Sequence, residues 1–314
     1  YERTIKNRIG NKSLMSFQEV RELNYNTKRI DKTTGVDLTL YAVPISTADF
    51  EWNTRFTLTY YRDKTTKRDP SQVLDIQDAP KYTWNDKWIH LSDGLLQPGE
   101  VNPGQLETDR RAGEVKIKDV NGYLRDKMGN KIYDENGRPM YSNMPDGIID
   151  NADLVMKYNN TPIPFSWNNN FRWKDFDLGI TMYGKFHQWK GNDKKTGANP
   201  ETLLSGGNTL VYVKDQYSYD NLDSQVPSFR FWQHGGVGYG DFFVEKAWYI
   251  RIDNITLGYT LPKKWIRGVL SSVRFYASMK NIATITPYKG ADPEYDIYLY
   301  PSTSSFTFGV DIKF

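Results

Sequence analysis

Cysteine is absent from the 314 residues, and histidine occurs only three times. Without cysteine there are no disulfides and no thiolate metal sites, so the fold does not depend on oxidative cross-links. No segment approaches the roughly 20 consecutive apolar residues of a membrane-spanning helix, which argues against a helical membrane protein. The 41 basic and 38 acidic residues are interleaved. The sequence contains no run of basic residues that could bind along a phosphate backbone, so the charge pattern argues against nucleic acid as a partner.

Aliphatic residues are also scarce, whereas aromatic residues are abundant. Only 38% of the chain is hydrophobic, yet 15% is aromatic, with 22 tyrosines and 9 tryptophans. A soluble domain of this length usually carries more apolar residues in its core. A transmembrane β-barrel uses its apolar residues in one thin outward band flanked by aromatic girdles. The composition therefore favours an antiparallel transmembrane β-barrel.

The last eleven residues, 304–314, alternate almost without fault between apolar and polar side chains. The apolar face of this predicted barrel-closing strand carries Phe306, Phe308, Val310, Ile312 and Phe314. A strand between lipid and water shows this pattern, because its apolar groups face outward and its polar groups inward. A soluble β-sandwich strand also alternates, but seldom over such a length and with so many aromatic residues.

Similar alternation recurs along the chain. Residues 49–61 predict one long strand, preceded by a hairpin partner at 35–43 and a connection that contains Pro44. Residues 164–173 and 176–186 predict a hairpin with a turn of only two residues, Lys174 and Asp175, as expected on the periplasmic side of a barrel.

Further strands are predicted at 248–261 and 273–280. In the first of these, Ile250 and Ile252 fall on the opposite face from Ile255, which predicts a β-bulge or a buried upper end. In total about eight to ten strands of spanning length are expected.

Three long regions, 62–111, 119–160 and 187–245, are predicted to be extracellular loops. Loops of this length are uncommon without a function. Small barrels of eight strands seldom carry them, so the chain is expected to be part of a larger barrel.

Several strings carry a family resemblance: GVDL at 35–38, DFEW at 49–52, GEVKIKDVNG at 113–122, FDL at 176–178, WYIRIDNITLGYTLP at 248–262 and YKGADPE at 288–294. Together with the final strand, they resemble the C-terminal part of the SusC/RagA family of TonB-dependent outer-membrane transporters of Bacteroidota. The strings cover most of the chain from residue 35 onward.

This resemblance implies a bacterial outer-membrane barrel of about 22 strands, of which the chain is the C-terminal part without its plug. It also implies import of oligosaccharides or oligopeptides, powered by TonB through the missing plug region and assisted by a SusD-like surface lipoprotein. Two alternatives from other classes are a self-contained barrel acting as an adhesin or structural protein, and a soluble β-rich carbohydrate-binding module.

One group of oxygen-bearing side chains is a candidate calcium site: Asp119, Asn121, Asp146, Asp150 and Asp153. The family string resembles a calcium loop, in which alternate oxygen ligands converge around a glycine turn. Here about two dozen extra residues separate its two halves. The alternative is a polar cluster of Asx turns without an ion. No other cofactor is predicted.

Five aromatic residues in the region 187–245 are candidates for contact with a substrate or a lipoprotein lid: Trp189, Tyr217, Tyr219, Trp232 and Tyr239. Aromatic faces beside polar groups stack on sugars, but they also pack a loop against itself. No catalytic residue is predicted, because the three histidines lack triad or metal-ligand spacing. The carboxylates of Asp292 and Glu294 offer only a weak glycosidase pair. The chain is therefore expected not to be an enzyme.

Overall fold

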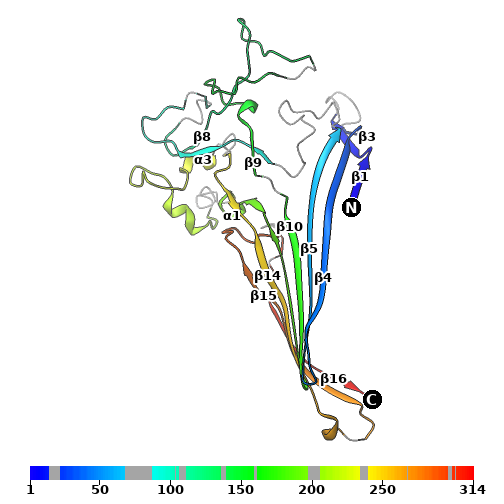
Figure 1. Ribbon diagram of the computed structural model, residues 1–314. Helices are drawn as coiled ribbons and strands as arrows, with labels where there is room; N and C mark the ends of the chain where they lie inside the picture. The colour runs from blue at the N-terminus through cyan, green and yellow to red at the C-terminus, as the bar shows by residue number, and fades with distance from the viewer. Residues whose placement is uncertain are drawn as a thin grey trace.

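The computed structural model describes residues 1–13, 22–67, 87–102, 104–105, 111–135, 139–158, 161–196, 206–233, 240–266, 268–295, 299–300 and 302–314. Its main feature is an eight-stranded antiparallel sheet, which we call the wall. In spatial order its strands are β1 (Glu2–Lys6), β4 (Ile30–Ser46), β5 (Phe50–Lys67), β10 (Ile163–Trp173), β11 (Phe176–Phe186), β14 (Tyr249–Thr260), β15 (Ser272–Ile285) and β16 (Ser305–Lys313). Figure 1 shows these strands running together as one long, curved layer.

The wall has one apolar and one polar face, as the alternation predicts. Paired positions from β5 to β16 form an apolar row of Trp52, Phe171, Leu178, Leu257, Ala277 and Phe308. The adjacent row on the other face is polar or small: Asn53, Asn170, Gly179, Thr256, Ser278 and Thr307. Because side chains alternate along every strand, matched registers keep each face continuous across the sheet.

Polar side chains that fall on the apolar face are hydrogen-bonded there. The Trp52 indole Nε1 donates to Asn169 Oδ1 at 3.1 Å, and the Trp167 Nε1 donates to Thr54 Oγ1 at 2.9 Å. Each pair joins β5 to β10, so a donor and an acceptor satisfy one another away from water.

The predicted hairpins are confirmed, with one correction. The turn between β10 and β11 consists of Lys174 and Asp175, as expected. However, β4 does not end before Pro44 but continues to Ser46, with a register shift between Ala42 and Ile45. A bulge accommodates a proline because the hydrogen bonding between strands is interrupted there, and the N–H that proline lacks is not needed.

The bulge expected in β14 is present at Asp253, where the registers toward both neighbours shift. This extra residue reverses the alternation. Ile250 and Ile252 consequently share the apolar face with Ile255, while Arg251 lies on the polar face. The upper end of the strand is also buried, since Tyr249 is 0% and Arg251 2% exposed.

A second region gathers at one end of the wall, opposite the short β10–β11 turn (Figure 1). We call the described residues within 87–158 and 188–248 the cap. Its elements are short: β6 (Lys87–Ile89), β7 (Ser92–Leu95), β8 (Val115–Ile117), β9 (Val155–Tyr158), β12 (Trp189–Gly191), β13 (Val244–Lys246), α1 (Asp193–Thr196), α3 (Phe229–Gln233) and 3₁₀ turns at Asn151–Asp153 and Val211–Asp215. Elsewhere lie the hairpin of β2 (Ile9–Ser13) and β3 (Glu22–Asn26) and a 3₁₀ turn at Lys263–Trp265.

The predicted loop regions correspond largely to this cap, although β5 extends into the first of them as far as Lys67. In the part of the chain that the structure describes, no helix has the length and apolar character needed to cross a membrane.

Candidate functional site

The cap has a hydrophobic core of its own. This core consists of Leu95, Val115, Ile117, Tyr217, Phe231 and Phe243, all at most 8% exposed. These residues come from β7, β8, α3 and the segments beside them, which are far apart in the sequence. The predicted loops are therefore packed into one folded unit rather than spread over the wall.

The buried carboxylate of Asp241 joins three segments of the cap. Its Oδ1 accepts hydrogen bonds from the Ser92 backbone N at 2.8 Å and Oγ at 2.7 Å. Its Oδ2 accepts from Lys157 Nζ at 2.6 Å and from the Tyr158 hydroxyl at 2.7 Å. Burial alone would raise the pKa of Asp241, but these hydrogen bonds favour the charged form more strongly and lower the pKa to about 2.

The candidate calcium ligands lie together in the cap. Asp153 is 0% exposed; its Oδ1 accepts from the backbone N atoms of Val120 and Asn121, and its Oδ2 from that of Asp150. Burial raises the pKa of the Asp153 carboxyl. The two halves of the family string therefore meet across the inserted segment.

The other four residues of this cluster also accept backbone N–H groups through side-chain oxygens. Asp119 Oδ2 accepts from Gly147 N at 2.6 Å, and Asn121 Oδ1 accepts from Asn143 N at 2.9 Å. Among the described residues, no group of three or more acidic or histidine side chains is arranged to hold a metal. These oxygens thus fit a cluster of turns held by hydrogen bonds from backbone amides. Calcium binding stays a prediction.

An arginine that the sequence analysis did not single out holds a loop against the wall. Arg251 is 2% exposed, and its Nη2 donates to both oxygens of Asp292, at 3.0 and 2.8 Å. Its Nη1 lies 3.5 Å from Glu294 Oε2, which also accepts from the Tyr183 hydroxyl. We call this group the latch. Both carboxylates of the weak glycosidase pair, Asp292 and Glu294, are therefore engaged by Arg251. The sequence signal that could have revealed this group is a single arginine within an otherwise apolar strand.

The five aromatic candidates do not form one site. Trp189 packs on Tyr158 with ring centroids 4.8 Å apart, and Tyr217 belongs to the cap core. Tyr219, by contrast, is 96% exposed. Tyr239 and the side chain of Trp232 lie outside the described residues.

Beside Tyr219 the cap contains a pocket of about 620 Å³. It combines two cations with aromatic rings and hydroxyls: Arg111, Arg230, Tyr217, Tyr219, Ser228 and Phe229. We call it the arginine pocket. Its volume falls within the range of small-molecule sites.

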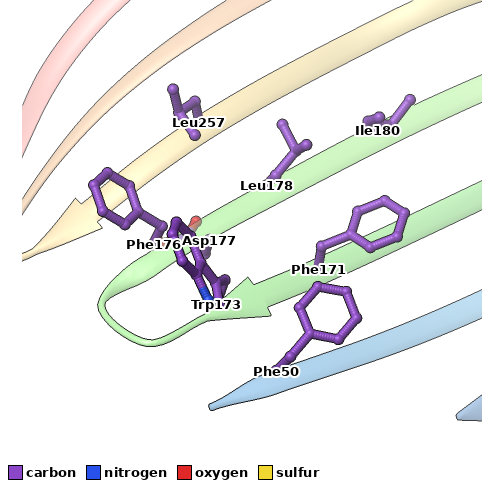
Figure 2. Close-up of a pocket in the computed structure, with 8 residues that line it drawn as sticks. All are labelled: Phe50, Phe171, Trp173, Phe176, Asp177, Leu178, Ile180 and Leu257. Carbon is purple, nitrogen blue, oxygen red and sulfur yellow. The ribbon is translucent and has the colours of Figure 1, made fainter. Parts of the chain in front are cut away.

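A second hollow, of about 840 Å³, lies on the apolar face of the wall near the β10–β11 turn. Figure 2 shows side chains of four neighbouring strands around it, with Phe171, Trp173 and Phe176 near the turn and Phe50 beside them. Its lining is almost entirely apolar, so it offers no arrangement for chemistry.

No family model matches the chain. In sequence it is 24% identical over 294 residues to the TonB-dependent receptor SusC of Bacteroides thetaiotaomicron, covering 89% of this chain and 26% of that protein. It is 24% identical over 313 residues to the TonB-dependent receptor P3 of Formosa agariphila, covering 89% of this chain and 28% of that protein. The chain thus spans about a quarter of the length of the curated relatives it matches.

The fold matches solved structures of the RagAB peptide transporter. One superimposes with a TM-score of 0.70 at 18% identity, covering 99% of this chain and 32% of the other. The "open-open" state of the RagAB peptide importer gives 0.69 at 18% identity, covering 100% and 32%. The chain is thus similar in sequence to two TonB-dependent receptors, one of them SusC, and shares the fold of the RagAB transporter over almost its whole length.

As part of an outer-membrane barrel, the wall has a defined orientation. Its apolar face, including the hollow in Figure 2, lies against lipid, and its polar face lines the barrel interior. Phe306, Phe308, Val310 and Ile312 share the lipid face of β16, and Phe314 follows that strand. That β16 closes the complete barrel stays a prediction. The relatives are named as receptors and transporters, in agreement with the expectation of a non-enzyme.

Proposed function

We propose that the chain supplies part of the wall and the extracellular cap of a SusC-like importer that moves oligosaccharides across the outer membrane. The carrying observation is a lipid-facing wall with a polar inner face, joined at one end to a separately packed cap. A closed structural barrel needs no such cap. The short turns at the other end fit the periplasmic side of outer-membrane barrels.

The proposed partners follow from the same assignment. The rest of the barrel and a plug complete the pore, and TonB acts through that plug. A SusD-like surface lipoprotein closes over the cap from outside, and the apolar face contacts membrane lipid. The soluble-module alternative does not fit a wall whose exposed face carries Trp173, Phe306 and Phe308.

Oligopeptides are the second candidate substrate. Two of the matched structures are named as a peptide transporter and a peptide importer, but 18% identity to them supports the shared fold rather than a shared substrate. The cap chemistry described below favours the oligosaccharide.

The test measures uptake by intact cells that carry the complete transporter. Fluorescent oligosaccharides and matched fluorescent oligopeptides are supplied with and without a protonophore, which removes the energy that TonB delivers. We expect protonophore-sensitive oligosaccharide uptake that disappears when the copurifying lipoprotein is deleted. Uptake that is insensitive to the protonophore, or restricted to peptides, would contradict the proposal.

A further inference from the structure

We propose that the arginine pocket binds a carboxylate-bearing sugar unit, so that the substrate class is an acidic oligosaccharide. This inference rests on the import function proposed above and narrows it. Four features of the pocket support it: two arginine cations, an exposed tyrosine ring, two buried hydroxyls and backbone amides that are already hydrogen-bonded.

The two cations of the pocket, Arg111 and Arg230, come from segments that are far apart in the sequence. Arg111 is exposed and, within the described residues, has no carboxylate in salt-bridge range. Arg230 forms an ion pair with Glu114, with 3.9 Å between Nε and Oε1. The Glu114 side chain is only 6% exposed. The described lining contains no acid. A planar guanidinium matches a carboxylate through two parallel hydrogen bonds, so this lining selects an anionic group of that shape.

The aromatic side chains provide a surface for a sugar ring. Tyr219 is 96% exposed beside the pocket, and Phe229 lines it from α3. Tyrosine is intermediate in burial on average, and this ring is almost fully open to solvent. Tyrosine combines an apolar face with a hydroxyl, which suits the apolar face and polar edge of a pyranose.

Two hydroxyls at the floor of the pocket lack partners. Within the described residues, neither the Tyr217 Oη nor the Ser228 Oγ makes a hydrogen bond, although both atoms are buried. Burial raises the pKa of Tyr217, which keeps its phenol protonated and able to donate. A buried unsatisfied donor is unfavourable. Because both hydroxyl atoms are closed off from solvent, a ligand with hydroxyl or carboxylate oxygens would satisfy them once these side chains turn toward the pocket.

Gly113 permits this floor. Its φ is +85°, and a Cβ there would lie 2.5 Å from Tyr217 Cδ1 and 2.6 Å from Ser228 Cβ. Only glycine adopts this backbone conformation freely and admits both side chains so closely. Its carbonyl accepts from Ser228 N at 2.9 Å, which places the serine against the tyrosine.

Three backbone amides of the pocket lining are already hydrogen-bonded within the cap. Tyr217 N donates to Val226 O, Ser218 N to Asn221 O and Ser228 N to Gly113 O. An extended peptide is commonly bound by adding a strand to a free edge. Because these amides are already paired, recognition here must come from side chains, which suits a sugar better than a peptide.

The experiment uses the complete transporter with its copurifying lipoprotein, purified in detergent, and calorimetric titration. The probes are three uronate oligosaccharides: tetragalacturonate, tetramannuronate and a hyaluronan tetrasaccharide. Methyl-esterified tetragalacturonate and tetraglutamate serve as the neutral sugar and the acidic peptide. We expect at least one uronate to bind, and its methyl ester and the peptide to bind at least tenfold more weakly.

Two variants locate the site. Arg111→Gln removes a guanidinium that pairs with the carboxylate, and Tyr219→Ala removes the ring that contacts the sugar, so each should weaken uronate binding about tenfold or more. Lys127→Gln and Tyr133→Ala change exposed cap residues elsewhere and should leave binding unchanged.

Three outcomes would overturn the inference: no uronate binds to the wild type, the ester or tetraglutamate binds as well, or the pocket variants match their controls. Cell uptake separates this failure from failure of the proposed function. Protonophore-sensitive uptake of neutral oligosaccharides, together with no uronate binding, would leave the importer standing and remove only the acidic substrate.

Discussion

The wall and the cap are stabilised by different kinds of interaction. In the wall, neighbouring strands are joined mostly by hairpins, and each face is continuous because registers match from β4 to β16. In the cap, single buried polar groups join segments far apart in the chain; Asp241 and Ser92, for example, are separated by 149 positions.

This difference has a physical cause. Lipid provides no hydrogen bonds, so the wall must pair its backbone internally and present apolar side chains on one face only. The cap is surrounded by water and can use charged groups, provided that each buried charge is paired. The wall is therefore sensitive to the placement of charge, whereas the cap is sensitive to the loss of particular partners.

The largest expected effect comes from placing a charge on the lipid face of the wall. Ile180→Arg should destabilise the barrel by roughly 2–4 kcal/mol, because the cation lies among apolar groups near the middle of β11. Thr181→Arg places the same side chain on the polar face. Heat-modifiable gel mobility and the amount of assembled protein in the outer membrane measure both. Equal losses from the two variants would contradict the assignment of faces.

In the cap, removal of one buried charge should have the next largest effect. Asp241→Asn weakens the bonds from Lys157 and Tyr158 and should lower cap stability by roughly 1.5–3 kcal/mol. Hydrogen exchange should accelerate at β7 and β9 but not in the wall. Asp220→Asn, at an exposed position of the cap, is the control. Faster exchange throughout the wall would show that the two regions are not separate.

Low pH should also destabilise the cap before the wall. The pKa of Asp241 is about 2, against an ordinary 3.8, so its contribution is complete above about pH 4 and is lost as the pH falls toward 2. The shift corresponds to about 2 kcal/mol. Asp153, with its raised pKa, acts in the opposite direction and favours the folded cap as it is protonated. As the pH falls from 5 to 2, protection against exchange, measured relative to the intrinsic rate at each pH, should be lost in the cap first, and Asp241→Asn should flatten that loss.

Most of the wall could be predicted from the sequence, because a strand between lipid and water requires strict alternation. Where prediction failed, the backbone carried an extra residue. Pro44 suggested the end of a strand, but a bulge carries β4 through it. At Asp253 the bulge itself was expected, yet its position determines that Arg251 faces the interior. Patterns of period two locate faces but do not determine where the period is interrupted.

The cap could not be derived in the same way. Its core and the arginine pocket bring together side chains from separate segments, and no periodicity relates Arg111 to Arg230 or Ser92 to Asp241. Pairing of this kind is specified by three-dimensional packing. The sequence left the two halves of the candidate calcium string separated by the inserted residues, and only the structure shows that they meet and that their oxygens accept backbone amides.

The smallest expected effect lies on the polar face of the wall, where charge is tolerated. Arg274 bonds Asp177 at 2.6 Å and Asp311 at 3.0 Å, reaching the former across Gly258. Asp311 is 54% exposed in its side chain, and exposed ion pairs contribute about 0–1 kcal/mol. Asp311→Asn should therefore change the urea midpoint of the complete barrel only slightly. A loss approaching that of Ile180→Arg would mean that the polar face is as sensitive to charge as the lipid face, and the contrast between wall and cap would need another cause.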